Sequence, residues 1–282
     1  MSKPEWLKIR LPETNQYSRV ASQLRHYHLF TICQEARCPN RSSCWDEGTA
    51  TFLILGNQCT RNCTFCAVTK GNPRQPDPEE PKRIAEAVHF LGLRYAVITS
   101  VTRDDLPDGG ASFFAATVKA VRKLSPSTVI ELLIPDFRGS QSSLETILAS
   151  RPQVISHNLE TPLNIYPHIN RPKDNYFLSL EIIRQAKRAG FITKSSLMVG
   201  LGESDEDIKQ AMQDLAEAGC DLLSLGQYLQ PTKKNLPVSK FYSPEEFASL
   251  ENLARSLGFK AVAAGPLIRS SYLAHQLYAR IS

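Results

Sequence analysis

The sequence predicts an α/β fold, specifically a partial (β/α)6-type barrel with an extension at each end. Beyond residue 50, apolar β-branched runs alternate with helical patterns. Such alternation implies parallel strands joined by right-handed crossovers, in either an open doubly wound sheet or a barrel. No dinucleotide-binding glycine fingerprint follows the first run, which counts against a Rossmann sheet. An incomplete barrel therefore accounts best for the pattern.

The predicted strands and helices alternate along the chain. The strands lie at residues 51–55, 95–101, 129–134, 154–157, 192–199, 222–225 and 259–263. The helices lie at residues 79–91, 112–124, 143–150, 176–189, 205–218 and 244–257. Ser204 and Ser243 carry the start signal of a capping box, and Gly219 and Gly258 end the same two helices.

This pattern divides the chain into three predicted regions. Residues 1–50 lack the strand–helix rhythm and form an extension against the barrel. Residues 51–265 form the barrel itself, and residues 266–282 form a C-terminal tail.

Charge and hydropathy limit the partners that the chain is expected to have. The 33 basic and 28 acidic residues give a net charge of +5, and the basic residues are scattered, so no nucleic-acid footprint is expected. Apolar runs fall well short of the roughly 18–20 residues of a membrane span. The first residues resemble neither an export signal nor a transit peptide. A cytoplasmic protein without a membrane or nucleic-acid partner is expected.

Cysteine is concentrated in one part of the chain. Six of the seven cysteines lie between residues 33 and 66. Disulfide frameworks are typical of small exported proteins with an even number of cysteines. This chain has 282 residues and seven cysteines, so metal ligation is the better interpretation of the cluster. Cys220 opens an apolar strand and is expected to be a buried small hydrophobic residue.

Cys59-x3-Cys63-x2-Cys66 directly follows the first predicted strand, at the mouth of the barrel. Thiolates bind zinc or iron–sulfur clusters. Structural zinc takes four donors, whereas a four-iron cluster held by three thiolates leaves one iron open to a substrate group. The spacing alone leaves both metals possible, and the position after the first strand favours iron–sulfur.

Cys33-x4-Cys38-x5-Cys44 is a second triplet, in a polar stretch expected to be irregular. A single zinc site that pooled both triplets would leave two thiols unused, whereas two clusters use all six. A cluster with an open iron beside a barrel suits the reductive cleavage of S-adenosylmethionine (SAM), which supplies a radical for unactivated carbon.

The chain resembles the lipoyl synthase family of the radical SAM superfamily. The doubled triplet and the tail sequence Arg269-Ser270-Ser271-Tyr272 are the most specific features. Other matching stretches lie at residues 33–45, 50–66, 103–110, 157–161, 194–203, 228–238 and 265–272. The departure from the family pattern, at residues 233–235, is expected to touch no cluster ligand.

The resemblance implies a reaction and two 4Fe–4S clusters. Members of the family insert two sulfur atoms at C6 and C8 of an octanoyl chain amide-linked to a lysine of a carrier domain. Cys59, Cys63 and Cys66 would hold the SAM-binding cluster, and Cys33, Cys38 and Cys44 the auxiliary cluster that supplies sulfur. The fourth ligand of the auxiliary cluster would be a tail serine, assigned to Ser271 with Ser270 as the second choice.

Further binding residues are expected where predicted strands end. The candidates for contact with SAM or substrate are Thr99, Ser100, Asp105, Asn158, Glu160 and Gly200. Ordinary surface carboxylates, hydroxyls and turn glycines are equally good interpretations of these positions. Arg171 and Lys173 are interpreted as solvated charges, with contact to an acidic carrier domain as the alternative.

The resemblance also implies partners, and two other interpretations remain open. The carriers would be E2 subunits of 2-oxoacid dehydrogenases and the glycine cleavage H protein, and the reductant a ferredoxin or flavodoxin. A methylthiotransferase acting on RNA would also insert sulfur, but no RNA-binding module is visible. A non-catalytic zinc-binding or electron-carrier protein would leave the barrel-like body without a role.

Overall fold

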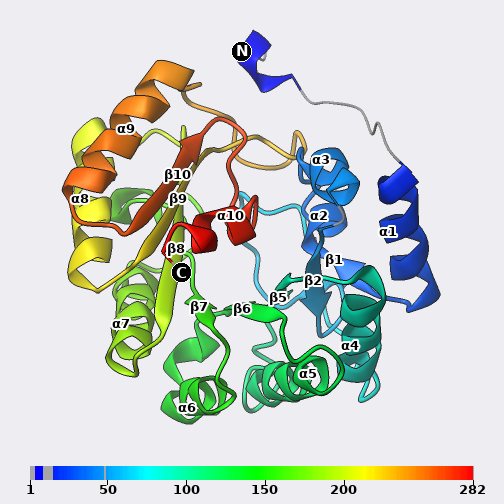
Figure 1. Cartoon of the computed structure of the whole chain (residues 1–282). Coiled ribbons are helices and arrows are strands. Elements are labelled where there is room, and N and C mark those ends of the chain that lie inside the picture. The colour runs from blue at the N-terminus through cyan, green and yellow to red at the C-terminus, as the bar shows by residue number, and fades with distance from the viewer. Residues whose placement is uncertain (1–3, 9–14, 48, 282) are drawn as a thin grey trace. The chain divides into compact units, whose positions relative to one another are not determined.

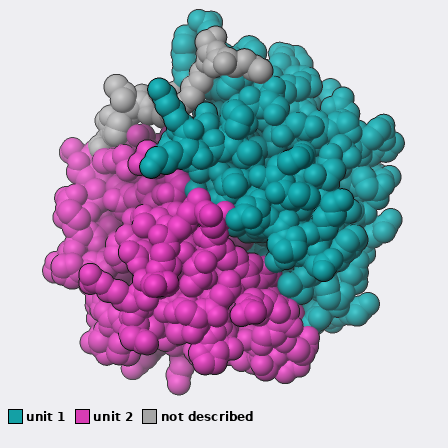
Figure 2. Space-filling view, turned by 180° about the vertical axis from the view of Figure 1, so that it is seen from behind, with its two compact units in different colours: residues 1–9, 63–66, 155–282 teal, residues 10–62, 67–154 magenta. Residues whose placement is uncertain are grey.

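The computed structural model describes residues 4–8, 15–47 and 49–281 (Figure 1). The chain forms two compact units, shown in different colours in Figure 2. Unit 1 comprises Met1–Ile9, Cys63–Cys66 and Ile155–Ser282, and unit 2 comprises Arg10–Asn62 and Ala67–Val154. The chain passes from unit 2 to unit 1 within the short strand β7 (Val154–Ser156).

Unit 2 contains a mostly parallel sheet with helices packed outside it. Its strands follow the order β1 (Phe30–Thr31), β2 (Thr51–Ile54), β5 (Tyr95–Ser100) and β6 (Val129–Leu133). β1 is antiparallel to β2, and the other pairs are parallel. Its longer crossover helices are α4 (Glu80–Leu91), α5 (Ala111–Leu124) and α6 (Gln141–Ala149). α5 packs against both α4 and α6 (Figure 1), and fully buried side chains such as Ile84 and Phe114 form the core.

Unit 1 repeats the strand–helix alternation. Its parallel strands follow the order β8 (Ile192–Val199), β9 (Leu222–Gln227) and β10 (Ala261–Gly265). The helices are α7 (Asp174–Arg188), α8 (Asp205–Glu217), α9 (Pro244–Ser256) and the short α10 (Ala274–Ala279). The apolar stripes of these helices and strands meet in one buried cluster that includes Ile183, Met212 and Leu223.

The sequence-based element boundaries agree with the structure within one or two residues across the barrel region. The capping boxes at Ser204 and Ser243 are both present and begin α8 and α9. β9 extends two residues past the predicted strand, to Gln227.

The N-terminal region is more regular than expected. α1 (Asn15–His26) is a full helix, and the stretch expected to be irregular contains the short helices α2 (Ile32–Glu35) and α3 (Arg41–Asp46). Thr31 caps α2 by accepting a hydrogen bond from the backbone N–H of Gln34. The irregular interpretation of residues 33–44 was therefore wrong, because helices of one or two turns are too short to show a 3.6-residue apolar period.

The C-terminal tail lies directly on strand β9. A Cβ atom on Gly226 would lie 2.0 Å from the carbonyl oxygen of Ile268, so only glycine allows this approach. Ile268 precedes the Arg-Ser-Ser-Tyr segment by one residue. The position of that segment therefore depends on the missing side chain at position 226.

Candidate functional site

In unit 2, the loop that begins at Cys59 is anchored to the end of β5. Cys59 ends the short strand β3 (Gln58–Cys59), which pairs with β4 (Thr69–Lys70). The hydroxyl of Thr60 donates to the carbonyl of Thr102 at 3.0 Å and accepts from the backbone N–H of Asp104 at 3.1 Å. The backbone N–H of Arg61 lies 3.4 Å from the sulfur of Cys59. The bonds of Thr60 therefore hold the neighbouring Cys59 close to the residues that follow β5.

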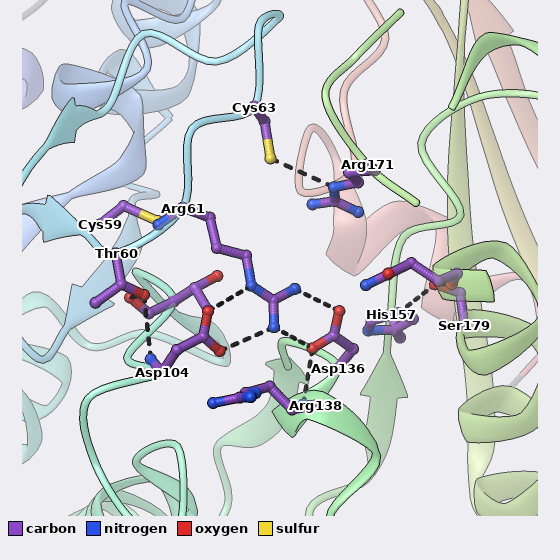
Figure 3. Close-up of polar contacts among 12 residues, drawn as sticks. Cys59, Thr60, Arg61, Cys63, Asp104, Asp136, Arg138, His157, Arg171 and Ser179 are labelled. Atoms are coloured by element: carbon purple, nitrogen blue, oxygen red, sulfur yellow. Dashed lines mark hydrogen bonds and ion pairs between the residues drawn. The ribbon is translucent and has the colours of Figure 1, made fainter. Parts of the chain in front are cut away.

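Arg61 makes bidentate contacts with two carboxylates (Figure 3). Its Nε and Nη2 atoms donate to Asp104 at 2.8 and 2.9 Å, and its Nη1 and Nη2 atoms donate to Asp136 at 2.5 and 2.6 Å. Burial opposes the charge of Arg61, but the bonds to Asp136 and Asp104 outweigh that effect and raise its pKa. Asp104 follows β5 and Asp136 follows β6, so Arg61 joins the cysteine loop to the ends of two strands.

In unit 1, the segment with Cys63 and Cys66 is held by polar contacts of its own. The hydroxyl of Thr64 donates to the carbonyl of His168 at 2.9 Å. The amide of Asn235 donates to the carbonyls of Thr64 and Cys66 at 2.9 and 3.0 Å. The expectation that residues 233–235 touch no cluster ligand was therefore wrong, because the fold brings Asn235 to the backbone of Cys66. Cys63 is buried. These contacts leave the two thiols in a fixed backbone frame.

Arg171 approaches the sulfur of Cys63. Its Nε–H donates to Cys63 Sγ at 3.3 Å (Figure 3), and its guanidinium lies over the Phe65 ring, 5.7 Å from the centroid. Burial disfavours the charge of Arg171, but Cys63 and Glu160 raise its pKa. The solvated interpretation of Arg171 was wrong, because this side chain is half-buried and bonded to a cysteine.

The triplet Cys33-x4-Cys38-x5-Cys44 lies within unit 2, on and between the two short helices α2 and α3. Cys33 is in α2, Cys44 is in α3, and Cys38 lies between them. Burial, with a smaller contribution from the neighbouring Cys38, raises the pKa of Cys33 to about 11. Burial also raises the pKa of Cys44, and the charges of Cys33 and Cys38 add to that effect. The three thiols therefore lie close together, because Cys38 acts on both of the others and Cys33 acts on Cys44.

The surroundings of these thiols fit ligands that carry negative charge. The indole N–H of Trp45 is buried without a hydrogen-bond acceptor among the described residues. It lies close enough to Cys33 to offset part of the rise in the pKa of that thiol. In the other triplet, N–H groups approach the sulfurs of both Cys59 and Cys63. Such donors suit the thiolate ligands of an iron–sulfur cluster.

None of the seven cysteines, all of them among the described residues, forms a disulfide, and Cys220 is buried as expected. Among the described residues, no three His, Cys, Asp or Glu side chains converge on the position of a single metal ion.

The strand-end candidates of unit 1 form part of a polar chain. Ser270 donates to the Asn158 side-chain oxygen at 2.8 Å, and the Asn158 side chain bonds to the Glu160 carboxylate. Burial raises the pKa of Glu160, and Arg171 and Asn158 oppose that shift. Glu160 has a φ of +74°, an uncommon backbone conformation for a residue other than glycine. Ser270 is therefore bonded within unit 1, and Ser271 follows it in the tail.

The remaining candidates differ in whether their side chains or backbone are already in contact with other residues of this chain. Thr99 donates to the carbonyl of Leu133, and Asp105 pairs with Arg103 at 2.7 Å. The Ser100 hydroxyl is buried without a partner among the described residues. Gly200 has a φ of +103° and lies against the Gln227 side chain and a backbone carbonyl, so packing within the chain accounts for it as a glycine.

Sequence reasoning missed Arg61, Asp136 and Arg171 as parts of the site. Arg61 lies between two cysteines of one motif, and that position alone was a usable signal. Asp136 and Arg171 carry no such signal, because 75 residues separate Asp136 from Arg61 and 108 residues separate Arg171 from Cys63.

Two family models match the chain. The radical SAM superfamily model matches residues 53–227, and the model of the N-terminal domain of lipoyl synthase matches residues 1–38. A lipoyl synthase of Rubrobacter xylanophilus is 50% identical over 97% of this chain and 86% of its own length. A lipoyl synthase of Thermus thermophilus is 49% identical over 98% of this chain and 87% of its own.

Solved structures share the fold at low sequence identity. Methylornithine synthase aligns with a TM-score of 0.57 and 15% identity, over 92% of this chain and 77% of its own. The hydrogenase maturase HydG aligns with a TM-score of 0.59 and 15% identity, over 75% of this chain and about half of its own, 52%. The predicted α/β radical SAM fold is thereby confirmed. No described helix has the length and apolar character needed to cross a membrane.

Proposed function

Because this chain belongs to the lipoyl synthase family of the radical SAM superfamily, we propose that it inserts sulfur at C6 and C8 of a protein-bound octanoyl-lysine. It is a sulfurtransferase whose cofactors are SAM and iron–sulfur clusters. The observation that carries the proposal is the pair of cysteine triplets, none of whose described members forms a disulfide, in a chain that matches lipoyl synthases over nearly its whole length.

Cys59, Cys63 and Cys66 are proposed to hold the SAM-binding 4Fe–4S cluster. When bound, this cluster supplies the electron that cleaves SAM to a carbon radical able to remove hydrogen from unactivated carbon. The residues of the chain position it. The Arg61 contacts fix the backbone around Cys59, and Asn235 and Thr64 fix the backbone around Cys63 and Cys66.

Cys33, Cys38, Cys44 and Ser271 are proposed to hold the auxiliary 4Fe–4S cluster, the source of the inserted sulfur. The hydrogen bond from Ser270 to Asn158 supports Ser271, because it gives the other serine a structural role. An alkoxide is a poorer match for iron than a thiolate, so that iron should be released more easily.

Binding of SAM is assigned to polar groups at the strand ends. Asn158 and Glu160 are proposed to face SAM, with the carboxylate accepting hydrogen bonds from the ribose. Thr99, Ser100, Asp105 and Gly200 are proposed as further contacts, and the unpartnered hydroxyl of Ser100 supports its place among them. The proposed regions are an extension (1–50) with the cysteines of the auxiliary cluster, a barrel (51–265) with the cysteines of the SAM-binding cluster, and a tail (266–282) with the serine ligand.

The partners follow from the substrate. The carriers are proposed to be octanoylated E2 subunits of 2-oxoacid dehydrogenases and the glycine cleavage H protein. A ferredoxin or flavodoxin is proposed as reductant, and the cytoplasm as the compartment.

Mass spectrometry of an anaerobic reaction tests the proposal. The reaction contains reconstituted enzyme, SAM, a reductant and a peptide with octanoyl-lysine. The expected product is the dithiol, which has gained two sulfurs and loses two hydrogens only on later oxidation to the cyclic disulfide, together with formation of 5′-deoxyadenosine. A cluster-loaded enzyme that thiolates a transfer RNA and leaves the peptide unchanged would contradict it.

A further inference from the structure

Arg171 is the charged group that the structure places against a proposed cluster ligand of unit 1. Its Nε–H points at the Cys63 sulfur from 3.3 Å, and its guanidinium carbon lies over the ring of Phe65, 5.7 Å from the centroid and two residues along the same loop. A cation over an aromatic face is attracted to the ring, and this contact helps to hold the guanidinium beside Cys63.

Arg171 also interacts electrostatically with a carboxylate of unit 1. Glu160 interacts electrostatically with Arg171 and bonds to Asn158, which in turn accepts from Ser270. The positive φ of Glu160 shows that the surrounding structure holds this residue in an uncommon conformation. Arg171 thus lies near an aromatic ring, interacts with an anion and directs its Nε–H at sulfur.

On the basis of the proposed function, we propose that Arg171 is a positioning residue that raises the reduction potential of the SAM-binding cluster through Cys63. The reduced cluster carries one more negative charge than the oxidised cluster. A cation and an N–H donor at a ligand sulfur stabilise the more negative state. The electron comes from the external reductant, and Arg171 makes its transfer to the cluster more favourable.

The first test is an EPR-monitored redox titration of the whole enzyme without SAM. The relevant cluster is identified as the one whose spectrum changes when SAM is added afterwards. Arg171→Gln should lower the ratio of reduced to oxidised cluster at a fixed potential roughly tenfold, which is 59 mV for a one-electron couple. Arg171→Lys keeps the charge without the planar donor, so its potential should lie between those of Arg171→Gln and the unmodified enzyme.

A matched control separates this local effect from a change in net charge. Arg188 is exposed near the end of α7 in the same unit, so Arg188→Gln removes the same charge far from any cysteine contact. Its potential should equal that of the unmodified enzyme. An equal shift in Arg188→Gln and Arg171→Gln would overturn the proposal.

A second test needs no substitution for its main signal. Arginine labelled with 15N in the guanidinium group is incorporated into the unmodified enzyme, and the reduced cluster is examined by pulsed EPR. A 15N coupling to the SAM-responsive cluster is expected, and it should disappear in Arg171→Lys. Absence of the coupling in the unmodified enzyme would overturn the proposal even if Arg171→Gln failed to assemble a cluster.

The SAM-free condition also distinguishes other roles of Arg171. If the side chain acted only by binding SAM, the SAM-free potential of Arg171→Gln would be unchanged, and the proposal would fail. If unmodified enzyme bound no iron on Cys59, Cys63 and Cys66, the proposed function would fail instead. A normal iron content without a shift in potential contradicts only the role of Arg171.

Discussion

At the scale of single residues, cysteine has two physically different roles in this chain. Cys63 lies in a polar setting and accepts an N–H bond from Arg171, whereas Cys220 is buried in the apolar core of unit 1. Burial raises the pKa of Cys220, as expected for a thiol that serves as a small hydrophobic group.

Replacing each of these two cysteines by alanine should therefore give opposite results. Cys63→Ala should lower the iron content by about four atoms per chain and abolish 5′-deoxyadenosine formation. Cys220→Ala should keep both and lower the free energy of unfolding by about 1 kcal/mol, the effect of a small core truncation. Iron analysis and product quantification check this. Retained 5′-deoxyadenosine in Cys63→Ala would contradict the ligand assignment.

The two tail serines should also differ. Ser271→Ala should keep SAM cleavage and stop sulfur insertion, because it removes the proposed auxiliary ligand. Ser270→Ala removes the bond to Asn158 and should lower stability by about 1 kcal/mol while sulfur insertion persists. The measurement is the yield of thiolated peptide and of 5′-deoxyadenosine for each variant. The reverse result would make Ser270 the ligand.

How far the sequence predicted the site depends on the range of the interactions. The cysteine triplets were predictable because their members lie within a few residues of one another. Arg171 was not, since a charged residue in a loop has the same local pattern whether it is solvated or bonded to sulfur. Asp136 was missed for the same reason, although its bonds to Arg61 support the loop that begins at Cys59.

At the scale of elements, one buried carboxylate joins strands β8, β9 and β10. Asp221 precedes β9 and accepts from Lys187 at 2.7 and 2.8 Å, from Lys260 at 2.9 Å, and from the backbone of Thr193 at 3.1 Å. Burial opposes its charge, but the two lysines outweigh burial and lower the pKa of Asp221 below its usual 3.8.

Asp221→Asn should therefore destabilise the chain in a pH-dependent way. A lowered pKa stabilises the fold above the unfolded-state value, and this contribution is lost as the pH falls below about 3.8 toward the folded-state value. We expect a loss of about 2 kcal/mol at pH 7, which diminishes in more acid solution. Urea unfolding across pH checks this, with Glu217→Gln as an exposed control. A constant difference at every pH would contradict it.

The Arg61 contacts make an ordered prediction for two carboxylates. Asp136 is 4% exposed and Asp104 is 26% exposed, so solvent screens the Asp104 pair more strongly. Asp136→Asn should lower the free energy of unfolding by about 2 kcal/mol and Asp104→Asn by about 1 kcal/mol. Urea unfolding of both variants measures the order. An equal or larger loss in Asp104→Asn would show that burial does not govern the contact.

The elements themselves were more predictable than the site. Strands and helices of the barrel region have long apolar patterns and local caps, and these act within a few residues of the chain. The N-terminal helices α2 and α3 were missed because one or two turns give no period, and β1 because two residues give no alternation.

At the scale of the whole molecule, the family assignment predicts a metal content. Two 4Fe–4S clusters require about eight irons and eight sulfides per chain. Anaerobic reconstitution followed by iron and sulfide analysis should give that number for the unmodified enzyme. The variant in which Cys33, Cys38 and Cys44 are all alanine should hold about four. A value near four in the unmodified enzyme would exclude the second cluster.

The contact between Gly226 and Ile268 affects how much SAM the enzyme consumes for each lipoyl group that it forms. A side chain at position 226 would displace the tail from β9 without altering any cysteine. On the proposed assignment, such a chain would still split SAM but would hold its sulfur source without the serine ligand. The cell would then consume SAM and reducing power without gaining a lipoyl group. On this assignment, glycine at position 226 prevents SAM cleavage that yields no lipoyl product.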